Sequence, residues 1–189
     1  MLDQLISGGC IEPTVVVMPT WLGINNESAP SVQTIAKQYS TYLFPYIEST
    51  YHVYNDSSRR AFAGLSQGSI LTREIYINYT SHFNYFGFFS GAQGSTAAPL
   101  NTYINSNQTA KNPALTNRSI YLSYGQYDAA FDDTKAFSQA LDGLGISYAV
   151  RMCPFGYHIW NTWQDAFWHF GKVSLWKGVP STNQTGHGL

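Results

Sequence analysis

The sequence predicts an α/β fold with a mostly parallel sheet, and three observations indicate it. Short apolar runs rich in β-branched and aromatic residues alternate with longer stretches whose apolar residues recur at helical spacing. The chain shows no internal repeat and no linker between zones of different composition. Its 189 residues, 44% of them hydrophobic, suffice for one domain with a substantial core. We expect this domain over residues 1–177 and a loose tail over 178–189, where turn formers dominate.

The strands and helices are expected to alternate along the chain. Strands are predicted at residues 13–18, 60–65, 83–89, 119–124 and 148–152, and helices at 2–8, 31–51, 68–79, 131–144 and 159–170. Pro13–Met18 contains three consecutive valines, which predicts a strand buried on both faces, as parallel strands are. Ser31 is a candidate N-cap for the long second helix, and Pro45 is expected to kink that helix.

A G-x-S-x-G motif at residues 64–68 stands where the predicted strand 60–65 gives way to the predicted helix 68–79. A serine on such a turn is held in a strained conformation, and small residues at positions 64 and 68 let the turn close. Because Ser66 precedes a helix, the backbone NH of Gln67 points to where an oxyanion would form. The motif predicts Ser66 as a nucleophile; the competing interpretation is a glycine-rich turn with an incidental serine.

A serine nucleophile needs a base and an orienting acid, which follow it in the order Asp, His in this kind of fold. Asp128 comes at the carboxyl end of strand 119–124, where open α/β sheets place their sites. Asp132 and Asp133 begin a helix, where carboxylates more often act as caps. His158 follows the acid in a strand-to-helix loop and is the predicted base; the alternative is a loop histidine that caps the next helix.

Composition limits the partners of the chain. Charged residues make up 11% and the net charge is −1, which argues against a nucleic-acid partner. The apolar runs are too short to cross a membrane. Cys10 and Cys153 are too few for a disulfide framework and lack metal-ligand spacing. The serine chemistry predicted above implies neither a metal nor an organic cofactor. Six N-glycosylation sequons, where chance gives about two, favour an extracellular protein whose export signal is not in this sequence.

Several segments together resemble the feruloyl esterase and acetyl-xylan esterase group of the α/β hydrolases, a putative-esterase family that includes esterase D-like proteins. The likeness runs to about Trp176 and is carried by residues 46–51, 60–69, 125–128 and 158–163. The family's G-L-S-x-G-G matches here except that Ser69 replaces the last glycine. The resemblance implies Ser66 as nucleophile, Asp128 as acid and His158 as base.

The resemblance also implies a three-layer α/β-hydrolase sandwich that is N-terminally truncated relative to the family. Family members carry further strands ahead of residue 2, ending in a His-Gly loop that supplies a second oxyanion donor. One missing strand normally lies between the strands predicted at 13–18 and 60–65. Either those two strands pair directly, or a second copy or a partner fills the gap. We expect exposed strand edges to favour self-association.

For function, the resemblance implies hydrolysis of carboxylic esters through an acyl-enzyme, with release of ferulic or a related hydroxycinnamic acid, or acetate, from plant cell-wall polysaccharide. The Gln67 NH would bind the oxyanion, and Trp21, Trp160 and Gln93 are candidates to contact substrate. An esterase or lipase of other acyl specificity would use the same triad. A catalytically weak relative that binds carbohydrate or a partner is the second alternative.

Overall fold

The computed structural model describes residues 1–20, 30–92, 113–179 and 184–186. Its strands are all parallel and form one sheet in their order along the chain. They are β1 (Ala61–Leu65), β2 (Tyr85–Phe89), β3 (Ser119–Gly125), β4 (Ala149–Cys153) and β5 (Gln184–Gly186). Parallel strands end at the same edge of a sheet, so the loops that follow β1, β3 and β4 meet there.

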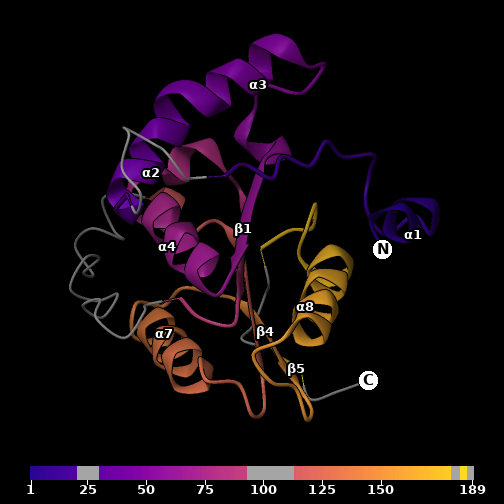
Figure 1. Ribbon diagram of the computed structural model, residues 1–189, viewed down its shortest axis with the longest axis vertical. Coiled ribbons are helices and arrows are strands. Elements are labelled where there is room, and N and C mark those ends of the chain that lie inside the picture. Colours follow the sequence, from indigo (N-terminus) through magenta and orange to yellow (C-terminus); the bar gives the residue numbers. More distant parts are fainter. Residues whose placement is uncertain (21–29, 93–112, 180–183, 187–189) are drawn as a thin grey trace.

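Helices cover both faces of the sheet, as Figure 1 shows. On one face lie α2 (Val32–Gln38), α4 (Gln67–Tyr79) and α7 (Phe131–Gly143). On the other lie α1 (Leu2–Ser7) and α8 (Trp160–Val173). Short 3₁₀ turns connect them at Ser57–Arg59, Thr80–His82 and Pro113–Leu115. The three-layer α/β prediction is therefore confirmed, with every predicted helix present.

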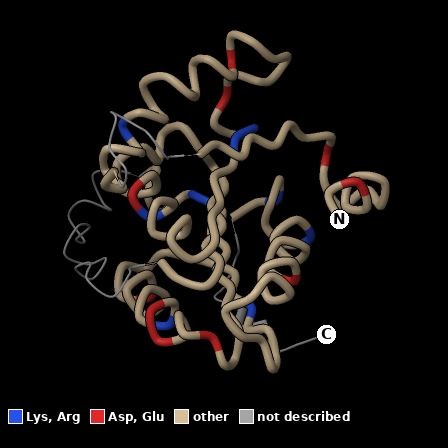
Figure 2. Tube along the Cα trace, in the orientation of Figure 1, with Lys and Arg blue, Asp and Glu red and all other residues tan. Residues whose placement is uncertain are grey.

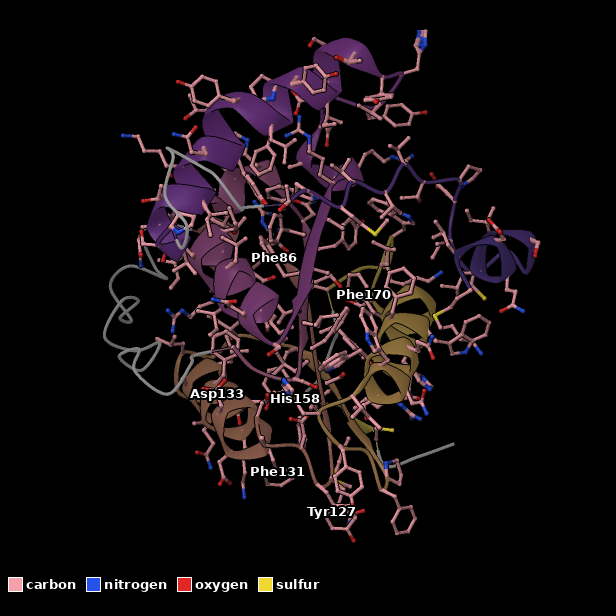
Figure 3. All side chains as sticks on the ribbon, in the orientation of Figure 1. Phe86, Tyr127, Phe131, Asp133, His158 and Phe170 are labelled. Carbon is pink, nitrogen blue, oxygen red and sulfur yellow. The ribbon has the colours of Figure 1, made fainter. Side chains whose placement is uncertain are left out.

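Each face of the sheet has its own apolar core. Phe86 is fully buried among residues of α2, α4 and α7. Phe170 is buried on the opposite face, together with Leu5 of α1 (Figure 3). The two cores explain why the strands carry bulky side chains on both faces of the sheet, as buried parallel strands do. Both cores pack against the sheet whose carboxyl edge carries the candidate site.

The long predicted helix is present but changes its pitch in the middle. Ser31 caps it, because its hydroxyl accepts a hydrogen bond of 3.1 Å from the backbone NH of Thr34. Between α2 and α3 (Phe44–Thr50), residues Tyr39–Leu43 form a π-helical turn. Pro45 follows at once; it has no NH to donate and its ring crowds the preceding turn. The expected kink thus takes the form of a π-turn.

The prediction of a buried strand over residues 13–18 is wrong. This segment has no regular secondary structure, and Val15 and Met18 are 53% and 88% exposed. It is held near its start instead: Trp176 donates a 3.2 Å hydrogen bond to Thr14, and the preceding Glu12 pairs with Arg59. A valine run becomes a buried strand only when another strand lies beside it, and none of the described strands lies beside residues 13–18.

The outer edge of β1 is therefore free. Among the described residues β1 pairs with β2 alone. A cavity of about 620 Å³ separates this edge from the segment 13–19, and α3 and α8 also contribute to its walls. The direct pairing of residues 13–18 with β1, one of the expected solutions to the gap, does not occur.

The C-terminal part also differs from expectation. Residues 184–186 form β5, parallel to β4, within the segment predicted to be a loose tail. Both cysteines are free. No helix in the described ranges is long and apolar enough to cross a bilayer. The few charged residues are scattered over the fold, with an acidic group at the start of α7 (Figure 2).

Candidate active site

Ser66 lies on a sharp turn between β1 and α4. Its backbone has φ 52° and ψ −117°, and such a positive φ is one that non-glycine residues rarely adopt. The turn can close because Gly64 has no Cβ; a Cβ at this position would lie 2.2 Å from the carbonyl oxygen of Gly68. At Gly68 itself a Cβ meets no atom within 4 Å, so the steric requirement expected at both glycines applies only to Gly64.

The structure brings Ser66, His158 and Asp128 into one hydrogen-bonded chain at the carboxyl edge of the sheet (Figure 3 labels His158). His158 Nε2 lies 2.8 Å from Ser66 Oγ, and His158 Nδ1 lies 2.7 Å from Asp128 Oδ1. An ionised carboxylate can only accept, so Nδ1 carries a proton and Nε2 is free to accept one from the serine. This is the geometry that activates a serine hydroxyl.

Burial and hydrogen bonding act in opposite directions on Asp128, whose side chain is fully buried. Burial raises the pKa of its carboxyl, but hydrogen bonds from the Ala130 NH and from His158, together with the nearby Ser90 hydroxyl, lower this pKa more. The Ala130 NH lies 2.8 Å from Oδ1. The carboxyl is therefore ionised at neutral pH, as an acceptor for the imidazole must be.

The loops that carry the acid and the base are fastened to each other. The Tyr127 NH donates to the Gly156 carbonyl at 2.8 Å, and the Gln126 NH donates to the Cys153 carbonyl at 3.0 Å. Gly125 and Gly156 touch through their backbones: a Cβ on Gly125 would lie 2.3 Å from the Gly156 carbonyl oxygen. The relative position of Asp128 and His158 thus depends on two glycines in contact.

Gln67 is the first residue of α4, so its NH is one of the donors that the helix leaves without an internal partner. It follows Ser66 directly and remains the predicted oxyanion donor. Trp160, the predicted substrate contact, begins α8 with its side chain 68% exposed. Its ring lies edge-on to Trp163, which in turn lies edge-on to His158. Trp21 and Gln93 lie outside the described residues.

Sequence reasoning missed the support behind this edge. Ser90 follows β2, is buried, and has φ 53°. The two residues after it are fixed by α7: the Gly91 NH donates to Thr134 Oγ1 at 3.0 Å, and the Ala92 NH donates to Asp133 Oδ2 at 2.7 Å. Asp133 was expected to cap the helix, but the N-cap of α7 is Ala130, and from the first turn the Asp133 carboxylate anchors the loop after β2. The signal was available, since Ser90 stands at the carboxyl end of a strand.

No family model matches the chain. One sequence relative, endo-1,4-beta-xylanase Y of Acetivibrio thermocellus, is 30% identical over 101 residues. This match covers 48% of the chain and 9% of the xylanase, so the chain corresponds to a small part of that protein.

Solved structures resemble the chain over most of its length. A mutant of the feruloyl esterase module from Clostridium thermocellum, complexed with sinapinate, gives a TM-score of 0.74 at 19% identity and covers all of this chain and 71% of that one. A ferulic acid esterase from Anaeromyces mucronatus gives a TM-score of 0.63 at 18% identity, and the match covers 76% of this chain and 54% of that one. S-formylglutathione hydrolase from Staphylococcus aureus gives a TM-score of 0.58 at 15% identity, and the match covers 74% of this chain and 62% of that one. The chain therefore has the α/β-hydrolase fold that feruloyl esterases and other serine hydrolases share.

Proposed function

We propose that the chain is a serine carboxylic-ester hydrolase that releases ferulic or a related hydroxycinnamic acid, or acetate, from plant cell-wall polysaccharide. The observation that carries the proposal is the hydrogen-bonded chain Ser66–His158–Asp128 at the carboxyl edge of the sheet. A buried carboxylate, an imidazole and a serine on a strained turn are joined here in one line of hydrogen bonds. They have the order required for acyl transfer.

In the proposed reaction the Ser66 hydroxyl attacks the ester carbonyl while His158 Nε2 takes its proton. The tetrahedral oxyanion is bound by the Gln67 NH, and Asp128 stabilises the imidazolium. As the intermediate collapses, the imidazolium returns the proton to the leaving alcohol, and the acyl group remains on Ser66. Water then attacks with His158 again as base, which releases the acid and regenerates the serine. None of these steps requires a metal or an organic cofactor.

The substrate class is supported by the relatives. The matched structures include two feruloyl esterases, one of them complexed with sinapinate, and the sequence relative is named a xylanase. The exposed Trp160 beside the triad offers a flat ring for an aromatic acyl group. Trp21 and Gln93 are proposed as further substrate contacts. An extracellular site of action agrees with the six sequons and with a polysaccharide substrate.

The experiment that tests this function compares hydrolysis of p-nitrophenyl acetate, methyl ferulate and a long-chain p-nitrophenyl ester. The purified chain is assayed beside Ser66→Ala and beside Ser138→Ala, a control on the exposed face of α7. We expect turnover that Ser138→Ala retains and Ser66→Ala loses by about 10³-fold or more, with methyl ferulate preferred over the long-chain ester. Equal turnover by parent and Ser66→Ala would remove Ser66 as nucleophile. A folded but inert parent would favour the catalytically weak relative.

A further inference from the structure

We propose that the side chains of Tyr127, Phe155 and Tyr157 form an aromatic platform that binds sugar rings of a neutral polysaccharide chain. The inference rests on the proposed function, because it identifies where the polysaccharide part of the ester substrate lies. The acyl part belongs to the triad and its surroundings, whereas this platform is a separate subsite for the glycan.

The three rings form one exposed cluster. Their residues are 51%, 74% and 54% exposed, in sequence order. The Tyr127 and Tyr157 rings have centroids 5.3 Å apart and planes inclined by 35°, and the Tyr127 and Phe155 rings lie 6.4 Å apart at 42°. None of the three belongs to either apolar core. Contiguous exposed rings of this kind mark binding surfaces more often than they serve stability.

Two residues of the platform are the chain neighbours of triad residues. Tyr127 precedes Asp128 in the chain, and Tyr157 precedes His158. In Figure 3 the Tyr127 label lies beyond His158, at the end of the sheet to which the strands point. A sugar chain on these rings would lie at the edge of the sheet that carries the triad, and in this proposal its acyl substituent extends from there to Ser66. A distant aromatic patch would offer no such connection.

The two loops present the rings rigidly. Besides the Tyr127–Gly156 hydrogen bond, the Phe155 NH donates to Gln126 Oε1 at 3.1 Å. Phe155 itself has φ 56°, a strained conformation that bulky residues rarely adopt. Its ring gains little burial in return. A strained backbone that holds an exposed aromatic ring is better explained by binding than by folding.

Sugar is the ligand that this chemistry fits. A pyranose has apolar C–H faces that cover aromatic rings and hydroxyls around its rim that bond to water or to tyrosine hydroxyls. The platform residues carry no charge, so they offer no ion pair to a charged ligand. Burying several ring faces under a flat, neutral ligand removes apolar surface from water without any desolvated charge.

The test measures binding of xylohexaose, an unesterified probe, by isothermal titration calorimetry. Since this probe contains no ester, its binding is independent of turnover, whereas hydrolysis of methyl ferulate requires no sugar; failure of the platform and failure of the proposed function are therefore distinguishable. The variants are Tyr127→Ala/Tyr157→Ala and the ring-preserving Tyr127→Phe/Tyr157→Phe. Tyr42→Ala is the matched control, because Tyr42 is 65% exposed on the π-turn outside the platform.

We expect the parent to bind xylohexaose with a Kd of about 1 mM or lower and the double alanine variant to bind roughly tenfold more weakly. The double phenylalanine variant and Tyr42→Ala should stay within about threefold of the parent. No binding by the parent, or equal binding by the double alanine variant, would overturn the proposal. So would equal losses in both double variants, or sedimentation showing that the parent is a dimer and the double alanine variant a monomer.

Discussion

Replacing Gly125 by alanine is expected to separate the two loops that carry Asp128 and His158. An added Cβ would lie 2.3 Å from the Gly156 carbonyl oxygen and 2.4 Å from its carbonyl carbon. Both are backbone atoms, so no side chain can rotate away to relieve the contact. To reach the ordinary range, which begins at 3.4 Å, the loops must move apart by about 1 Å.

This displacement sets the expected magnitude. A misplacement of about 1 Å in a catalytic constellation costs roughly 100-fold in turnover. The same overpacking costs about 1–3 kcal/mol of the free energy of unfolding, which for a chain of this size lowers Tm by roughly 2–12 °C. A 100-fold loss corresponds to about 2.7 kcal/mol of transition-state stabilisation, which is comparable to the loss of stability.

The assay is kcat for p-nitrophenyl acetate, with Tm measured on the same preparations. Gly143→Ala is the matched control, because a Cβ at this position in α7 meets no atom within 4 Å. Alanine there should leave kcat unchanged and raise stability by up to about 1 kcal/mol. If Gly125→Ala keeps kcat within about threefold of the parent, the contact between the two glycines does not position the triad, and the reasoning is refuted.

Two further predictions concern the acid and the N-terminal helix. Because the folded pKa of Asp128 is lowered, its carboxylate stabilises the fold above the unfolded value of about 3.9, and this stabilisation is lost as pH falls through the folded pKa. The free energy of unfolding of the parent minus that of Asp128→Asn should therefore be constant above about pH 5 and decrease below about pH 4. Both are measured by urea titration, and a difference that stays constant down to about pH 2 would contradict this. Leu5→Ala should cost about 2–5 kcal/mol in the same titrations, since Leu5 is fully buried against Gly171, and a loss below about 1 kcal/mol would show that α1 is not part of the core.

Most of the fold could be predicted because it is encoded locally. The strands at 61–65 and 119–125 and the helices α4, α7 and α8 begin and end within three residues of the positions that periodicity and turn residues indicate. The Ser31 cap was also readable, because a cap needs only the residue and its following turn. The same reasoning failed at residues 13–18, since the burial of a valine run depends on a neighbour that the run itself does not specify.

The sequence by itself determined the order of strands and helices, the turn at Ser66, and which aspartate and histidine follow strands. Only the tertiary structure decided that these groups meet: Ser66 and His158 are 92 residues apart, and the parallel sheet brings them within 2.8 Å. It also decided that β1 pairs only with β2 among the described strands and lies beside a cavity, and that Tyr127, Phe155 and Tyr157 form one surface. The physical reason is that periodicity and turn chemistry act over a few residues, whereas contacts between loops depend on how the whole sheet is packed.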